Sequence, residues 1–587
     1  MALAALLSAA PVIAQVAHDG VGGHHGDRQY PIEVLSSRPD AISGGDALIR
    51  VTVKKNVSAR DMRIHLNGAD VTSSFIIDGA ARRLTGLVGG MRVGENLLEV
   101  IDPRGNVRGK GRAEADMGGW YSQGASTGGV TDNFMLSNGY ALASSSLNVF
   151  GNNCNDLTAA ESMAMVKERF VEAYGLPAHT QGFGCSGGSY QQHQITDNYP
   201  GLLDGIIPGC SFPEVGFAAI NFITDGWLLD TYFNSKAAVP WSAEQMRRVT
   251  GFLLYETAPN VAGGAHRIDP KPGTTSCAAV PGERRYDAVS NPRGVRCTVY
   301  DHTVNVYGRD PATGFALRPL DNVGIQYGLG TLNASVISVD QFLDLNEKIG
   351  GFDRDATIVP QRTVADLSAA RAAYQTGRLT SGRGGLASVP IIDFRDYNDA
   401  LPGGDIHVRY HSFSLRKRLD KANGRHDNQV MVVNDNRFGL YSTANPLLRE
   451  AILKMDRWIT AIKADTRDIR EIDKVVQNKP ADVQEGCYSR DPTPVFIAQV
   501  QVREQEATTT CGMLYPTNSF PREVAGADIA SDIIKCQLKP LTSSDYAVAF
   551  TPAQWARLQA IFPSGVCDWF KPGIEQQDLL GTWVFFE

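Results

Sequence analysis

Apolar positions along residues 158–214 follow the period of a helix, then a short strand, then a helix and a strand again. The first helix, 158–174, spaces its apolar residues three or four apart and ends at a Gly-Leu-Pro sequence. A second helix, 189–199, ends before Pro200, and residues 203–208 form the short apolar run of a buried strand. Helices that alternate with strands in this way are typical of an α/β protein with a parallel sheet.

The first half of the chain also carries a different pattern. Residues 31–102 contain short apolar runs separated by turn formers such as Ser-Gly-Gly-Asp and Asn-Gly, which predicts a small β-sandwich of immunoglobulin-like type. Later core strands are expected at 389–394 and 428–433, and the second of these is expected to be the last strand of the core. The stretch between residue 216 and the first of these strands is too long for a plain connection, so we expect a functional insertion there.

The turn between the first strand and the second helix carries the candidate chemistry. Gly184-Cys185-Ser186-Gly187-Gly188 matches the GxSxG nucleophile elbow, in which a serine stands on a tight bend between a strand and a helix. Glycines beside the serine avoid a collision of Cβ atoms with the neighbouring strand or helix. The flanking order of elements is that of an α/β-hydrolase, so Ser186 is the predicted nucleophile.

A serine hydroxyl needs a base to take its proton. In an α/β-hydrolase the acid follows the penultimate strand and the histidine follows the last one, but no histidine follows His426 here. The loop after 389–394 contains Asp399, Asp405 and His407. We therefore predict His407 as the base, with His426 as the alternative, and Asp405 or Asp399 as the acid that orients it.

An acyl-transfer site also needs two donors for the oxyanion. The backbone amide of Gly187, directly after the nucleophile, is the predicted first donor. The loop at 120–124 is the candidate for the second donor, and Gln123 lies within it.

These patterns together predict an α/β fold: an α/β-hydrolase core with an N-terminal β-sandwich domain and a large lid insertion. The expected parts are a signal-like segment at 1–20, an Ig-like β-sandwich at 30–105, the first half of the hydrolase core at 112–215, the lid insertion at 216–385, the second half of the core at 386–465 and a cysteine-bearing C-terminal region at 466–587.

Two features of the sequence predict a secreted or periplasmic protein. Residues 1–14 form an apolar run that ends in small residues, which resembles the apolar region and cleavage site of a secretory signal. Nine cysteines are dispersed along the chain, and none lies in a CxxC pair with metal spacing. Disulfide bonds formed in an oxidising compartment are therefore expected, with at least one thiol left over.

Composition and charge limit the classes of binding partner that this chain is expected to have. The net charge of −7 gives no basic surplus, which disfavours a nucleic-acid partner. No later apolar run of about 18 residues exists, so no membrane span is predicted. The sequence indicates no metal site and no cofactor, and it leaves the oligomeric state open.

The elbow, together with Asn198-Tyr199-Pro200-Gly201-Leu202-Leu203-Asp204-Gly205-Ile206-Ile207, resembles secreted bacterial serine hydrolases. The nearest described relatives are the tannase and feruloyl esterase group, where a cysteine also precedes the nucleophile. Segments around 140–215, 296–330, 389–433 and 536–570 resemble a family of large exported bacterial proteins of undefined activity.

Two features depart from the tannase pattern. Tannase-type enzymes have a cysteine directly after the catalytic histidine, bonded to the one before the serine, and this chain has no His-Cys pair. The glycine-rich oxyanion loop expected before residue 120 is shortened to Gly118-Gly119.

The resulting prediction is an exported serine esterase that cleaves small-molecule or oligomeric esters through an acyl-enzyme on Ser186. Phenolic esters, hydroxyalkanoate oligomers and polyesters are the expected substrates. An amidase or peptidase with the same nucleophile, and a non-catalytic binding protein on a hydrolase fold, are the alternatives.

Overall fold

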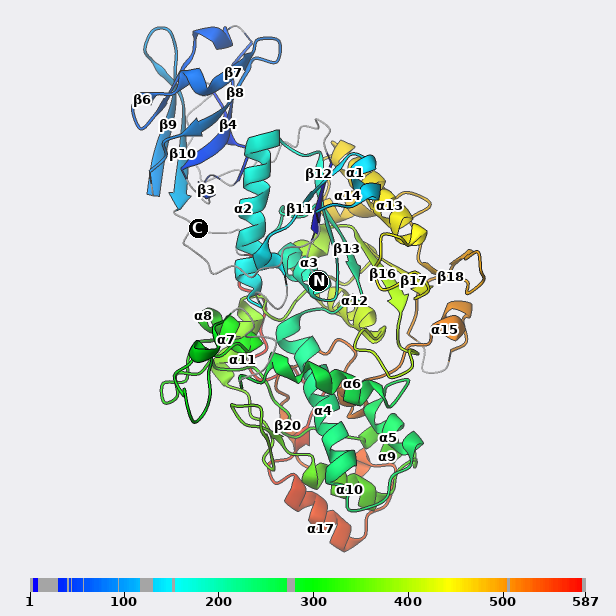
Figure 1. The fold of residues 1–587 in the computed structure, drawn as a ribbon. Coiled ribbons are helices and arrows are strands. Elements are labelled where there is room, and N and C mark those ends of the chain that lie inside the picture. Colours follow the sequence, from blue (N-terminus) through cyan, green and yellow to red (C-terminus); the bar gives the residue numbers. More distant parts are fainter. Residues whose placement is uncertain are drawn as a thin grey trace.

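The computed structural model describes residues 4–8, 30–116, 130–149, 154–271, 280–503 and 507–582, apart from residues 38, 40–41, 44, 56 and 93. Figure 1 shows a β-rich N-terminal module beside a central sheet, with a largely helical region on the other side of that sheet. The module contacts the sheet domain where strand β4 (Asp46–Thr52) meets helix α2 (Asp156–Tyr174).

The N-terminal module consists of two sheets around one core. One sheet has the order β2-β4-β8-β7 and the other β3-β10-β9-β5-β6. Along β4 buried and half-buried side chains alternate, because successive residues of a strand face opposite sides. The strands expected between residues 31 and 102 are confirmed, while the immunoglobulin-like topology stays a prediction. The remaining strands are β2 (Ile32–Val34), β3 (Ile42–Ser43), β5 (Arg63–Leu66), β6 (Ala69–Asp70), β7 (Phe75–Asp78), β8 (Arg83–Gly89), β9 (Gly94–Ile101) and β10 (Val107–Asp116).

The central sheet has eight strands in the order β11-β1-β12-β13-β16-β17-β18-β19. The neighbours from β12 to β18 run parallel, and the strands at either end pair antiparallel. This mixed sheet confirms the predicted α/β class. The strands are β1 (Ala4–Ser8), β11 (Tyr140–Ala143), β12 (His179–Cys185), β13 (Gly205–Gly209), β16 (Ile391–Tyr397), β17 (Gln429–Asp435), β18 (Gly486–Tyr488) and β19 (Phe496–Ala498).

Helices cover both faces of this sheet. Ile206 packs with residues of α2, α3 (Gly187–Asn198) and α12 (Tyr410–Asn423), whereas its neighbour Ile207 packs with residues of α13 (Pro446–Ala464). Adjacent strand residues thus serve opposite cores, which explains why the strand read as one continuous apolar run. The short helix α1 (Asn133–Ser137) precedes β11.

The apolar run near the start of the chain contributes β1, which pairs with both β11 and β12. A short apolar segment is typical of an inner strand of a sheet as well as of the centre of a signal sequence. The signal-like segment at 1–20 therefore stays a prediction, and residues 9–20 lie outside the described part.

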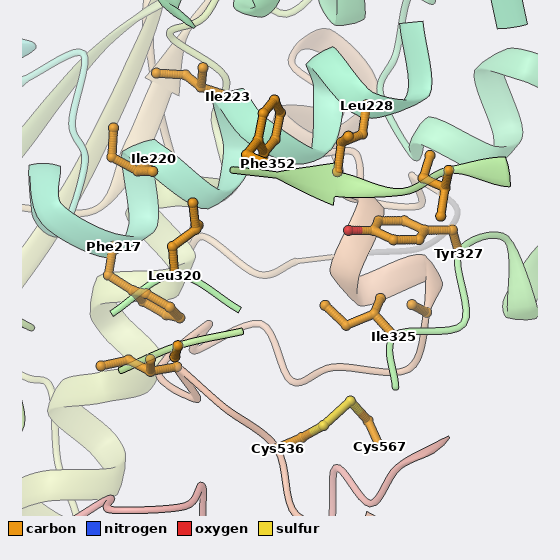
Figure 2. Close-up of a cluster of buried hydrophobic side chains, with 14 of the residues drawn as sticks. Phe217, Ile220, Ile223, Leu228, Leu320, Ile325, Tyr327, Phe352, Cys536 and Cys567 are labelled. Atoms are coloured by element: carbon orange, nitrogen blue, oxygen red, sulfur yellow. A yellow bond between two sulfur atoms is a disulfide. The ribbon is translucent and has the colours of Figure 1, made fainter. Parts of the chain in front are cut away.

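The insertion between β13 and β16 contains the largest hydrophobic core of the described chain. Figure 2 shows Phe217, Ile220 and Leu320 in this core, together with the Cys536–Cys567 disulfide, which is part of it. Its elements are α4 (Ile220–Ser235), α5 (Ala243–Thr250), α6 (Thr257–Ala262), α7 (Val299–His302), α8 (Val304–Tyr307), α9 (Leu329–Asn333), α10 (Val339–Lys348), β14 (Gly351–Phe352), β15 (Ile358–Val359) and α11 (Leu367–Gln375).

The C-terminal region divides its contacts between two places. Its first part adds β18 and β19 to the central sheet, so the strand at 428–433 is not the last one, contrary to expectation. Its second part packs on the insertion, where α17 (Pro552–Ile561) contacts α10 (Figure 1). The other elements are α14 (Glu471–Gln477), α15 (Thr510–Leu514), α16 (Pro521–Val524), β20 (Leu538–Lys539) and β21 (Val566–Cys567).

Three disulfide bonds lie within the described residues, namely Cys185–Cys210, Cys487–Cys511 and Cys536–Cys567. They fit the predicted oxidising compartment, outside the cytoplasm. A search of the described ranges finds no helix with the length and apolar character needed to span a bilayer.

Candidate active site

Ser186 stands on the bend between β12 and α3. Its backbone has φ 56° and ψ −108°, and residues other than glycine rarely adopt such a positive φ. The Ser186 N–H donates to the carbonyl of Gly209 (3.0 Å) on the neighbouring strand. Ser186 is half-buried between the buried residues Cys185 and Gly187. A strained, partly exposed serine at the carboxyl edge of a parallel sheet is the geometry of a nucleophile elbow.

A disulfide fixes this bend to the next strand. Cys185, the last residue of β12, is bonded to Cys210, which directly follows β13. Cys210 also has a positive φ of 44°, so both strand ends turn sharply at the crosslink. The cysteine before the serine thus finds its partner on the adjacent strand, and this pairing accounts for the missing His-Cys sequence.

His407 lies beside this disulfide. One of its ring nitrogens is within 4.8 Å of the sulfur atoms of both Cys185 and Cys210. The imidazole Nδ1 is 2.7 Å from Asp405 Oδ1, which also accepts the His407 backbone N–H. Among the described residues the second ring nitrogen, Nε2, has no hydrogen-bond partner. The structure therefore brings Asp405, His407 and the strand end of Ser186 together.

The two candidate acids have different environments. Burial alone would raise the pKa of Asp405, but the hydrogen bond and charge of His407 outweigh it and hold the pKa below its ordinary value. Asp399 is fully buried, which raises its pKa to about 7, although the charge of Arg395 partly opposes this. Its carboxylate accepts the Arg409 backbone N–H at 2.9 and 3.1 Å. Asp399 thus caps the turn before α12, and Asp405 contacts the imidazole.

The chain also matches a known protein family. A family model described as a tannase-like family of unknown function (DUF6351) matches residues 32–117 and 111–578. The chain belongs to this tannase-like family. No curated protein and no solved structure matches the chain. A tannase-like membership is consistent with hydrolase chemistry, and the family itself assigns no activity.

His426 is not near the elbow of this tannase-like chain. It precedes β17, whereas Ser186 follows β12, and the two strands run in the same direction. Residues before and after parallel strands lie at opposite edges of the sheet. The His426 Nδ1 is instead 2.7 Å from Asp420 Oδ1, and both side chains are more than one-third exposed.

Of the two predicted oxyanion donors, the structure describes Gly187. Gly187 is the first residue of α3 and is buried. The first N–H groups of a helix lack intrahelical acceptors and lie at the positive end of its dipole, so they suit a developing anion. Gln123 lies outside the described residues.

No direct hydrogen bond joins the Ser186 hydroxyl to His407 in the described structure. Such bonds are often long without substrate and tighten in the complex. The described structure therefore brings His407 close to the strand end of Ser186 without a hydrogen bond between the two side chains.

Cys185, Cys210 and His407 are the sole trio of close potential metal ligands found in the described ranges. Metals bind the thiolate form of cysteine. Because these two sulfur atoms are joined to each other, the trio is a disulfide beside an imidazole and not a metal centre.

Sequence reasoning missed two residues around the elbow. Phe212 packs its ring edge-on against His407, with ring centroids 5.8 Å apart. The Tyr441 ring lies where a Cβ on Gly209 would be, and its hydroxyl donates to Ile207 O. Neither residue belongs to a motif, and only the glycine at a strand end next to the site could have indicated such a close approach.

Proposed function

We propose that this chain is an exported serine hydrolase with an α/β-hydrolase core, and that it cleaves carboxylic esters through an acyl-enzyme on Ser186. The observation that carries the proposal is the position of His407. Its imidazole is oriented by Asp405 and lies against the disulfide that holds the strand end of Ser186.

The proposed reaction assigns one role to each group. Ser186 Oγ attacks the ester carbonyl while His407 Nε2 takes its proton, and Asp405 stabilises the imidazolium that forms. The Gly187 N–H donates to the oxyanion of the tetrahedral intermediate. His407 then protonates the leaving alcohol, and in the second half it activates the water that releases the acid.

The insertion at 216–385 is the proposed lid of this site. Asn260 of α6 donates to the carbonyl of Gly404 (3.1 Å), in the loop that carries His407. Val408, next to the histidine, packs in one apolar cluster with Phe222 of α4 and Ala258 of α6. An element in contact with the catalytic loop is well placed to exclude water and to shape the acyl and alcohol pockets.

The proposed substrates are esters that occur outside the cytoplasm, namely phenolic esters, hydroxyalkanoate oligomers or polyesters. The three disulfides support an extracytoplasmic location. The tannase-like family supports ester chemistry. The same nucleophile could also attack amides, since a Ser-His-Asp set does not by itself choose the leaving group.

Labelling with a fluorophosphonate tests the nucleophile. The parent protein should be labelled, Ser186→Ala should not be, and Ser544→Ala, at an exposed serine, should be labelled at the parent rate. Hydrolysis of p-nitrophenyl esters but not of the matching anilides is expected. Failure of the folded parent protein to react would contradict the proposal and favour a binding protein on a hydrolase fold.

A further inference from the structure

Arg395 is a buried cation next to the proposed site. It lies on β16, between β13 and β17, and its side chain is 1% exposed. Burying a guanidinium is costly unless its donors are satisfied. The acceptors that satisfy Arg395 belong to segments on either side of the site.

One acceptor lies on the nucleophile side. Arg395 Nη2 donates to the carbonyl of Ser211 at 2.9 Å. Ser211 directly follows Cys210, whose disulfide holds the residue before Ser186. The guanidinium is thus connected to the elbow through one peptide unit and one disulfide.

Two acceptors lie on the base side. Arg395 Nη1 donates to the carbonyls of His407 and Val408, each at 3.3 Å. The preceding residues Gly403 and Gly404 both have positive φ, and they are not part of a helix or strand. The backbone of His407 is therefore held by Arg395 where regular secondary structure does not hold it.

A third group of contacts fixes the plane of the guanidinium. Nε and Nη2 both donate to Ser412 Oγ, at 3.1 and 2.9 Å, and this hydroxyl donates to Asp393 Oδ1 at 3.0 Å. Asp393 lies two residues before Arg395 and so on the same face of β16. A planar fork with five donors can serve all these acceptors at once, and a lysine ammonium cannot.

We propose that Arg395 is a positioning residue that sets the distance between the His407 base and the Ser186 elbow. The inference rests on the proposed function, because it assumes that proton transfer between these residues limits acylation. Arg395 would not contact the substrate, so its loss should lower kcat while leaving KM nearly unchanged.

The test compares Arg395→Lys with Arg416→Lys by the kinetics of p-nitrophenyl ester hydrolysis. Lysine keeps a charge beside Asp393 and so avoids an unpaired buried carboxylate. Arg416 is a matched control on α12, because its guanidinium is also buried but binds Gln429, Glu485 and Gln501. A misplacement near 1 Å can cost about 100-fold, so we expect kcat to fall about 10- to 100-fold in Arg395→Lys, with KM within about twofold. Arg416→Lys should leave both unchanged.

Ser412→Ala provides a second variant in case Arg395→Lys does not fold. It removes the hydroxyl that fixes the guanidinium plane, so kcat should also fall, and the two substitutions together should cost less than the product of their separate effects. A kcat of folded Arg395→Lys within twofold of the parent, or a rise in KM that accounts for the whole effect, would overturn the inference. An inactive, unlabelled parent protein would instead overturn the proposed function, and the inference with it.

Discussion

The Cys185–Cys210 disulfide gives the sharpest prediction, because the chain contains a matched control for it. Cys185 and Cys210 are separated by 25 positions, and Cys487 and Cys511 by 24. All four side chains are buried. Replacing either pair by alanines therefore removes a crosslink of almost the same loop length from an equally buried place.

The expected cost in stability is the same for both pairs. In the chain-entropy description, closing a loop of either length lowers the entropy of the unfolded chain by an amount worth about 3.5 kcal/mol at 25 °C. Urea unfolding followed by intrinsic fluorescence should show comparable losses for the two double-alanine variants. Only the first pair is next to Ser186, so the two variants should differ in activity.

Fluorophosphonate labelling below the urea transition measures that difference. The variant without Cys185–Cys210 should react at least about tenfold more slowly, since the elbow then loses its covalent link to the end of β13 and keeps only weaker contacts, such as the hydrogen bond between Ser186 N and Gly209 O. The variant without Cys487–Cys511 should react at the parent rate. Equal slowing in both would show a global effect of lost stability, and no slowing in either would refute the idea that the disulfide positions the nucleophile.

Two further predictions concern the acids and the alternative base. Asp405→Asn should lower kcat by about 10⁴-fold, because the amide no longer stabilises the His407 imidazolium. His426→Ala should change kcat by less than twofold. A large loss in His426→Ala with little loss in Asp405→Asn would show that His426, and not His407, is the base. Asp399 has a folded pKa raised to about 7, so the folded state holds its proton more tightly than the unfolded state does. Stability should therefore fall as pH rises from about 4 to 7, by at most about 1.4 kcal/mol per pH unit. Asp399→Asn should lessen this dependence of the urea unfolding free energy on pH, and an unchanged slope would contradict the assignment.

Periodicity predicted the elements that are long or strongly apolar. The strand expected at 389–394 is observed at Ile391–Tyr397, and the helix expected at 158–174 is observed at Asp156–Tyr174. These segments pack on both sides or along one face, and such burial leaves a regular pattern in the sequence. The GxSxG pattern likewise predicted the turn at Ser186, where the serine itself has a positive φ of 56°.

The last two strands of the central sheet left no comparable pattern. β18 and β19 are three residues each, Gly486–Tyr488 and Phe496–Ala498, and the first contains a glycine and a cysteine. Their place in the sheet is fixed by the pairing of β18 with β17 and by the Cys487–Cys511 disulfide. Both are contacts over long sequence distances, and a single sequence does not specify them.

The choice between the two histidines was available from strand direction. His426 precedes its strand, and a residue before a parallel strand lies at the edge opposite to a nucleophile that follows one. The Cys185–Cys210 pairing was not available in this way, because the spacing of nine cysteines allows many partners.

The loop after β17, where a hydrolase histidine would be expected, has a structural role here. Tyr441 has φ 51°, and its N–H donates to Asp396 Oδ2 at 2.6 Å, while its ring fills the space beside Gly209. A tyrosine held in this way occupies the approach to the β13 end from that loop. The loop after β16 therefore supplies both members of the Asp405–His407 pair, two residues apart and joined by two hydrogen bonds to one carboxylate oxygen. In the proposed mechanism the acid and the base therefore come from one loop and move together, so their common distance to Ser186 is the quantity that the surrounding structure must hold.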